Sequence, residues 1–106
     1  MSNESYVRTI SGFTIGTTVG GSTALDMEGY NDGIVEVVSG TVTTLSFHVS
    51  VDNITYYQLH DAANVAIAVT ATAGRAYALP VGVLGCRYLK ITAVGAGVGN
   101  MHRKTP

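Results

Sequence analysis

The chain has 106 residues, of which 46% are hydrophobic and only 12% are charged, and its formal net charge is −1. This length predicts a single domain over residues 1–106 with one core, and the apolar balance excludes disorder, which requires few apolar residues and many charges. No apolar run approaches the ~18 residues of a membrane-spanning helix, so no membrane partner is expected.

The first part of the chain shows short extended segments and no helical period. Residues 1–5 predict a short N-terminal arm and lack the basic and apolar segments of a signal peptide. Turn residues then separate four segments that are rich in residues favouring strands. These expected strands cover residues 6–10, 13–17, 22–27 and 33–38.

The clearest alternation of apolar and polar residues lies over residues 44–51. One face carries Leu45, Phe47, Val49 and Val51, and the other carries Thr44, Ser46, His48 and Ser50. This pattern predicts a half-buried strand with the apolar face inward. Asp and Asn tolerate left-handed dihedrals, so Asp52-Asn53 predicts a tight hairpin turn into a strand over residues 54–59.

The second half of the chain continues the pattern of short extended segments separated by turns. Residues 65–69 alternate, Gly74-Arg75 predicts a turn, and Pro80 ends a strand over 76–79 because it cannot donate to a ladder. Residues 81–85 predict a loop that packs across one end of the fold. The last expected strand is 87–94, with Leu89 and Ile91 inward, followed by a flexible segment from about residue 95 and a basic tail over 101–106.

The spacing of these segments indicates the fold class. Turn signals recur roughly every eight to twelve residues, which is typical of sandwiches and barrels. About seven or eight short strands at this spacing predict an all-β protein, an antiparallel β-sandwich of jelly-roll-like form.

The charges are unevenly distributed along the chain. Residues 1–61 contain all seven acids and one base, a net −6, whereas residues 62–106 contain five bases and no acid, a net +5. This pattern fits scattered surface charge, head-to-tail contact between copies, or a basic C-terminal tail that docks on an acidic partner. Because the chain has few charged residues to keep an isolated monomer soluble, we expect much of its surface to be covered by partners, including further copies of the chain. Arg103 and Lys104 alone make too small a phosphate footprint to predict nucleic-acid binding.

No group of residues predicts catalysis or a resident cofactor. The three histidines, His48, His60 and His102, lack metal-ligand spacing, and a single cysteine cannot form a thiolate-rich zinc site. Cys86 is interpreted as a buried small hydrophobe or, alternatively, a reactive thiol. No nucleophile motif occurs, so no enzyme activity is expected.

One acidic segment deserves comparison with calcium loops. Residues 26–33 contain four oxygen-bearing side chains, those of Asp26, Glu28, Asn31 and Asp32. The segment lacks the spacing of an EF-hand loop, and ordinary polar connections between strands have the same composition. The interpretation is a polar loop, and no metal is expected.

The candidate interaction residues are two tyrosines and two bases. Tyr56 and Tyr57 are adjacent, so one of them should face outward beside the turn at Asp52-Asn53. Exposed aromatic rings beside polar loops can stack on sugars or anchor protein interfaces, although a tyrosine at a sheet edge can also simply expose its hydroxyl to water. Arg103 and Lys104 complete this candidate surface.

Several segments resemble a group of small structural proteins of tailed bacteriophages. The matching segments are Ala24-Leu25-Asp26 to Gly29-Tyr30, the strand over 44–52, Tyr57-Gln58-Leu59, Ala76-Tyr77-Ala78-Leu79-Pro80 and Arg87-Tyr88-Leu89-Lys90-Ile91. They span roughly residues 22–94. The resemblance implies a β-sandwich located in the virion, with the major capsid protein or other head and tail proteins as partners. It implies a capsid decoration (cement) protein or, alternatively, a head-fibre, neck or tail component.

Two features qualify this resemblance. Such proteins often finish with an apolar strand, whereas residues 101–106 are polar and basic, so the last strand is completed either internally or by a neighbouring subunit. The segment Val49-Ser50-Val51-Asp52 is also similar to the galactose-binding-like sandwich family, which supports the fold more than an activity. A carbohydrate-binding adhesion module is therefore the alternative function.

Overall fold

The structure is a computed structural model that describes residues 7–105, so the expected arm at residues 1–5 lies outside the described residues. Within this range the chain forms nine strands and two 3-10 helices. The strands are β1 (Val7–Ile15), β2 (Leu25–Asp26), β3 (Asp32–Gly40), β4 (Thr44–Ser50), β5 (Tyr57–Gln58), β6 (Ala68–Thr70), β7 (Arg75–Ala78), β8 (Tyr88–Val94) and β9 (Gly97–Lys104), and the 3-10 helices are η1 (Val19–Gly21) and η2 (Val81–Gly85). None of the helices within residues 7–105 is long and apolar enough to cross a membrane.

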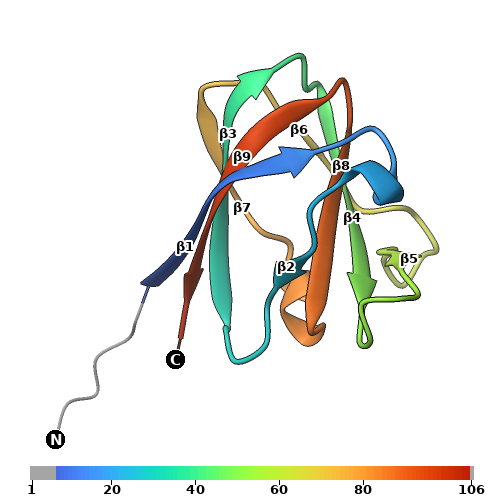
Figure 1. Ribbon diagram of the computed structural model, residues 1–106. Coiled ribbons are helices and arrows are strands. Elements are labelled where there is room, and N and C mark those ends of the chain that lie inside the picture. Colours follow the sequence, from blue (N-terminus) through green and yellow to red (C-terminus); the bar gives the residue numbers. More distant parts are fainter. Residues whose placement is uncertain (1–6, 106) are drawn as a thin grey trace, which may run out of the picture.

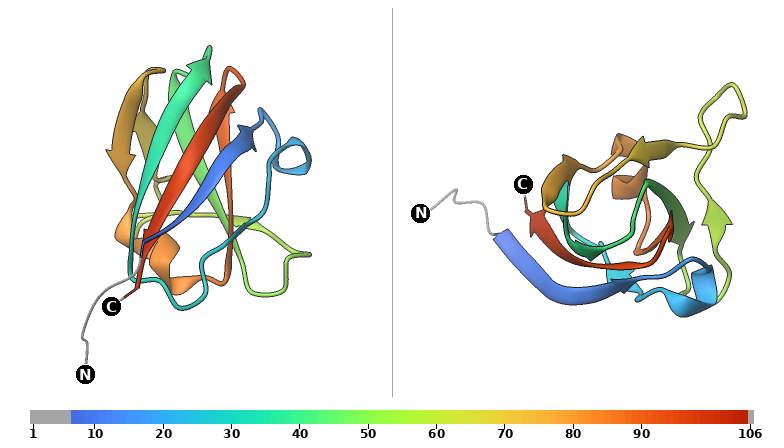
Figure 2. Two further views of the ribbon diagram at one scale, coloured as in Figure 1. Left: turned by 60° about the vertical axis from the view of Figure 1, so that its left-hand side comes forward. Right: turned by 90° about the horizontal axis from the view of Figure 1, so that it is seen from above.

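The strands form two antiparallel sheets packed face to face, as Figures 1 and 2 show. The first sheet has the order β1-β9-β3-β7, and the second has β2-β8-β4-β5 with β6 also paired to β4. Strand pairing is nested: β1 pairs with β9, β2 with β8, β3 with β7, and β4 with β5 and β6. Rolling up such a nested hairpin produces a jelly roll. The predicted β-sandwich is confirmed, and the ninth strand arises because two short strands pair with successive parts of β4, β6 with Thr44–Ser46 and β5 with His48 and Val49.

One hydrophobic cluster fills the space between the sheets. In the second sheet, Leu45 and Phe47 of β4 lie opposite Ala93 and Ile91 of β8, and all four side chains are buried. In the first sheet, Val35 of β3 lies opposite Met101 of β9. These apolar side chains belong to a single core cluster, so both sheets are held together by burial of the same apolar surface.

The first strand differs from the prediction because two expected strands, 6–10 and 13–17, form one. β1 pairs with β9 along its length, and its register shifts between Ile10 and Phe13. Gly12 adopts a φ of 66° at this bulge. A bulge accommodates one extra residue and bends the strand without ending it, which the turn-like Ser11-Gly12 sequence does not reveal.

The expected flexible C-terminal segment and basic tail are wrong, because residues 97–104 form β9 between β1 and β3. Glycines there suggested mobility, but Gly99 is buried, and a Cβ at this position would lie 2.9 Å from Phe13 ring carbons. Glycine therefore leaves room for the Phe13 ring to pack against the strand. The strand is completed within the chain itself.

The strand over 44–51 also ends earlier than expected. Val49 is half-buried and packs against the core, but β4 ends at Ser50 and Val51 is 80% exposed. The connection to β5 covers residues 51–56 and is longer than a tight two-residue hairpin. Asn53 adopts the expected left-handed conformation, with φ 60°. The inward assignment of Val51 is therefore wrong because the sheet ends before it.

Candidate functional site

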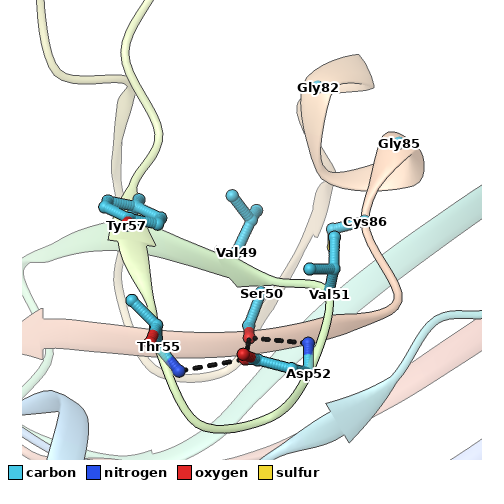
Figure 3. A pocket seen from close by; sticks show the side chains of 9 residues that line it. All are labelled: Val49, Ser50, Val51, Asp52, Thr55, Tyr57, Gly82, Gly85 and Cys86. Carbon is cyan, nitrogen blue, oxygen red and sulfur yellow. Dashed lines mark hydrogen bonds between the residues drawn. The ribbon is translucent and has the colours of Figure 1, made fainter.

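An open groove lies at one end of the sandwich, between the β4–β5 connection and η2 (Figure 3). Its volume is about 440 Å³. These two segments, the adjoining ends of β4 and β5 and the residue after η2 supply the lining, which consists of Val49, Ser50, Val51, Asp52, Thr55, Tyr57, Gly82, Gly85 and Cys86. Most of these residues present carbon atoms, so the groove can hold an apolar group with few polar contacts.

Hydrogen bonds within the β4–β5 connection hold one wall of the groove. Asp52 Oδ1 accepts from the backbone N–H groups of Ile54 and Thr55 at 2.9 and 3.0 Å. Ser50 Oγ donates to the same oxygen at 2.9 Å and accepts from Asn53 N at 3.0 Å. These donors, the two backbone amides first, lower the pKa of Asp52, so its carboxylate is ionised at neutral pH.

The second wall is η2, which brings the core to the edge of the groove. Val83 of η2 is completely buried, and Leu84 and Cys86 are half-buried against the core cluster. Burial raises the pKa of the Cys86 thiol, which donates to Val83 O at 2.9 Å. A neutral, partly buried thiol in this position acts as a small apolar group.

Large apolar side chains stand exposed on the two segments that form the groove. Val51 is 80% exposed, Ile54 83%, Tyr57 70% and Val81 84%. We refer to these four residues as the apolar rim. Val51 and Tyr57 line the groove, and Ile54 and Val81 are next in sequence to the lining residues Thr55 and Gly82. Exposed single hydrophobic residues are common on protein surfaces, but a group of large ones on the segments that form one groove marks a candidate site of interaction.

The two candidate tyrosines lie in different environments. Tyr57 lines the groove and is the outward-facing member of the pair. The Tyr56 hydroxyl donates to Asn53 Oδ1, and its ring is covered by Lys90 Nζ, 4.8 Å from the ring centroid. Tyr56 therefore supports the loop, and Tyr57 is the ring available for contact.

The two candidate bases lie in β9 and not in a free tail. Arg103 stacks on the Tyr30 ring at 4.4 Å, and its Nη1 donates to Asp26 O at 2.5 Å. Lys104 is exposed at the end of the strand, with Val7 and Asp32 as its cross-strand neighbours. The structure does not bring these two residues to the lining of the groove.

The opposite charges of the two halves of the sequence meet in the fold. Arg87, from the basic half, lies 3.3 Å from Glu28 of the acidic half. Arg103 likewise contacts the backbone of Asp26. The interleaved sheets therefore place bases beside acids at these positions, as the interpretation of scattered charge expects.

The acidic segment forms local turns. Asp26 Oδ1 accepts from Glu28 N at 3.0 Å, and Asp32 Oδ1 accepts from Gly33 N at 2.8 Å. Across residues 7–105, no three His, Cys, Asp or Glu side chains gather in an arrangement that could hold a metal ion.

Two of the three histidines form local hydrogen-bond contacts. His48 Nε2 lies 2.9 Å from Thr92 Oγ1, and His60 Nδ1 lies 3.0 Å from Gln58 O.

A chain of polar side chains crosses the outer face of the first sheet. His102 Nε2 lies 2.5 Å from Glu36 Oε1, and His102 Nδ1 lies 2.9 Å from Thr9 Oγ1. A hydroxyl, an imidazole and a carboxylate in series resemble the parts of a hydrolase triad. Thr9, however, lines neither the groove nor the cavity of about 410 Å³ that Glu36 and Asn100 border. The three side chains come from neighbouring strands and form a cross-strand hydrogen-bond network.

Only part of this site was predicted from the sequence. Tyr57 was a candidate, but Val51 was expected in the core, and Ile54, Val81 and Gly85 were not among the candidates. The hydrophobic residues Val81, Val83 and Leu84 in a short connection were a usable signal, because such a loop must either pack on the core, as Val83 does, or expose an apolar side chain, as Val81 does. The position of Gly85 opposite the β4–β5 connection could not be deduced from local patterns.

Comparison of the chain with known protein families, curated proteins and solved structures found no match.

Proposed function

We propose that the chain is a structural component of a bacteriophage virion that decorates the capsid and braces the head. The observation that carries this proposal is the apolar rim, four large exposed side chains on the segments that form the groove, of which Val51 and Tyr57 line it. Water contact with so much apolar surface is unfavourable, so a partner that covers it gains binding free energy.

The fold and the sequence resemblance support the same proposal. Jelly rolls occur in viral capsid and lectin domains, where they present loops from a rigid sandwich. The segments that resemble tailed-phage structural proteins include the strand over 44–52 and Tyr57-Gln58-Leu59, which flank the groove. A sandwich that binds only the assembled shell would stabilise it by mass action.

The experiment compares phage particles that contain the chain with particles from which its gene has been deleted. Mass spectrometry should find the chain in purified particles, and cryo-electron microscopy should place it on the outer surface of the head. Particles without it should lose infectivity at lower temperature or milder osmotic shock. Absence of the chain from purified particles would refute a virion role, and a position at the neck, tail or head fibre would replace decoration by that role.

A carbohydrate-binding adhesion module is the second candidate, and the exposed Tyr57 ring favours it. The ring lines the same groove as Asp52, whose carboxylate can accept hydrogen bonds from a sugar, and Thr55, whose hydroxyl can accept or donate them (Figure 3). A glycan array should then show binding that Tyr57→Phe retains, because the ring is kept, and Tyr57→Ala loses. The absence of binding on the array would remove this candidate.

A further inference from the structure

The groove is continuous with the hydrophobic core of the sandwich. Val49 and Cys86 line it, and both also pack against the core cluster. Gly82 and Gly85 form part of the opposite wall and contribute no side chains. A Cβ at Gly85 would meet no atom within 4 Å. An apolar group entering the groove would therefore extend the core at this end.

The size of the groove suits one large side chain with its flanking backbone. Its volume of about 440 Å³ is near the lower end of the range for ligand pockets. Two exposed members of the apolar rim, Val51 and Tyr57, line the groove, so the backbone beside an inserted side chain would also contact carbon atoms. The shape and lining favour an aliphatic side chain over a polar one.

A single negative charge lies in this apolar lining. The hydrogen bonds that the Asp52 carboxylate accepts from Ser50, Ile54 and Thr55 all use Oδ1, and these donors belong to its own loop. The Arg87–Glu28 ion pair and the His102–Glu36 hydrogen bond do not involve Asp52. A cation beside the groove would complement this charge, and no basic residue lines the groove itself.

We propose that the groove binds a peptide segment of a partner protein in which a large aliphatic residue is followed by lysine or arginine. The aliphatic side chain enters between Val49 and Gly85, and the basic side chain reaches Asp52. This inference rests on the proposed function, since the partner would be a protein of the particle. It specifies the chemistry by which the chain recognises that partner.

The test titrates the full chain with short peptides and follows it by NMR. The probe is the acetylated and amidated tetrapeptide Gly-Leu-Lys-Gly, with Gly-Leu-Glu-Gly and Gly-Ser-Lys-Gly as comparisons. The first peptide should shift the resonances of Val49, Val51 and Tyr57 saturably, with a Kd on the order of a millimolar. Replacing lysine by glutamate should weaken binding about two- to fivefold, and replacing leucine by serine should weaken it by about tenfold or more.

Two variants separate the apolar and the charged contributions. Gly85→Leu fills the groove and should abolish binding, whereas Gly20→Leu should not, although Gly20 also lies in a 3-10 helix with open space around its Cβ position. Asp52→Asn retains an oxygen that can accept from Ile54 and Thr55, so the loop is kept. This variant should bind the lysine and glutamate peptides equally.

Other outcomes overturn the inference in defined ways. Equal affinity of the wild-type chain for the lysine and glutamate peptides, or shifts that map away from the groove, would refute it. Methyl glycosides that shift Tyr57 where the peptides do not would identify a sugar site. Self-association that Gly85→Leu abolishes would identify a second copy as the occupant. A virion role is tested separately by locating the chain in particles, so either proposal can fail without the other.

Discussion

His102 and Glu36 join the two central strands of the first sheet, with His102 Nε2 2.5 Å from Glu36 Oε1. An ionised carboxylate only accepts hydrogen bonds, so the imidazole donates. This hydrogen bond, together with a weaker one from Asn100 Nδ2, lowers the pKa of Glu36 below its ordinary value of 4.5. The pair therefore links stability to pH.

Stability should fall in acid partly through Glu36. Because the pKa of Glu36 is lower in the folded state, the unfolded chain binds more protons at this position as the pH falls. The stabilisation is present above pH 4.5 and is lost as the pH falls through the folded pKa. Urea unfolding should show wild type more stable than Glu36→Gln at pH 7, with the difference shrinking below pH 4.5. In a His102→Gln background, the difference in stability between the two proteins should be smaller at every pH. An unchanged difference would show that the hydrogen bond from His102 does not cause the lowered pKa of Glu36.

Phe47 and Val51 should differ sharply in their contributions to stability, although the alternation places them on one face. Phe47 is completely buried, so Phe47→Ala should cost about 3–5 kcal/mol and lower the melting temperature by more than about 10 °C. Val51 lies beyond the sheet, and Val51→Ala should change stability by less than about 0.5 kcal/mol. Thermal unfolding monitored by circular dichroism measures the change in stability of both variants. Similar shifts for the two variants would show that β4 extends further than the structure has it.

Truncation of the chain after Ala96 should prevent folding. This change removes β9, which pairs with both β1 and β3, and it removes the completely buried Met101. The first sheet would lose the strand at its centre, leaving its apolar face open to water. Truncation after Lys104 is the control and should leave a folded protein. A dispersed, native-like NMR spectrum of the shorter chain would contradict the placement of β9.

Gly99 should tolerate substitution poorly. A Cβ there would lie 2.9 Å from Phe13 ring carbons and 2.9 Å from the Glu36 carbonyl oxygen, and the backbone of β3 cannot move away easily. Gly99→Ala should therefore cost about 1–3 kcal/mol, the usual cost of overpacking. Gly85→Ala is the matched control, because its Cβ position is open. Denaturant unfolding compares the two, and equal stabilities would argue against close packing of Phe13 on β9.

Local sequence patterns were sufficient to predict the sandwich and several of its strands. The alternation of Leu45 and Phe47 with polar residues has the period of an extended chain, and this period identifies a strand whatever its partner is. The end of the strand over 76–79 was equally local, since proline cannot donate to a ladder. β7 ends at Ala78, close to the predicted position.

Where the sheets end, and which segments lie at their centre, was decided only by the tertiary structure. Gly99 looks mobile in isolation and becomes a packing position only because Phe13 lies against it. Val51 continues the apolar alternation, yet it is exposed because β4 has no partner beyond Ser50. Burial depends on neighbours that are distant in the sequence, so the alternation of one strand cannot specify its limits, its neighbours or the groove at its end.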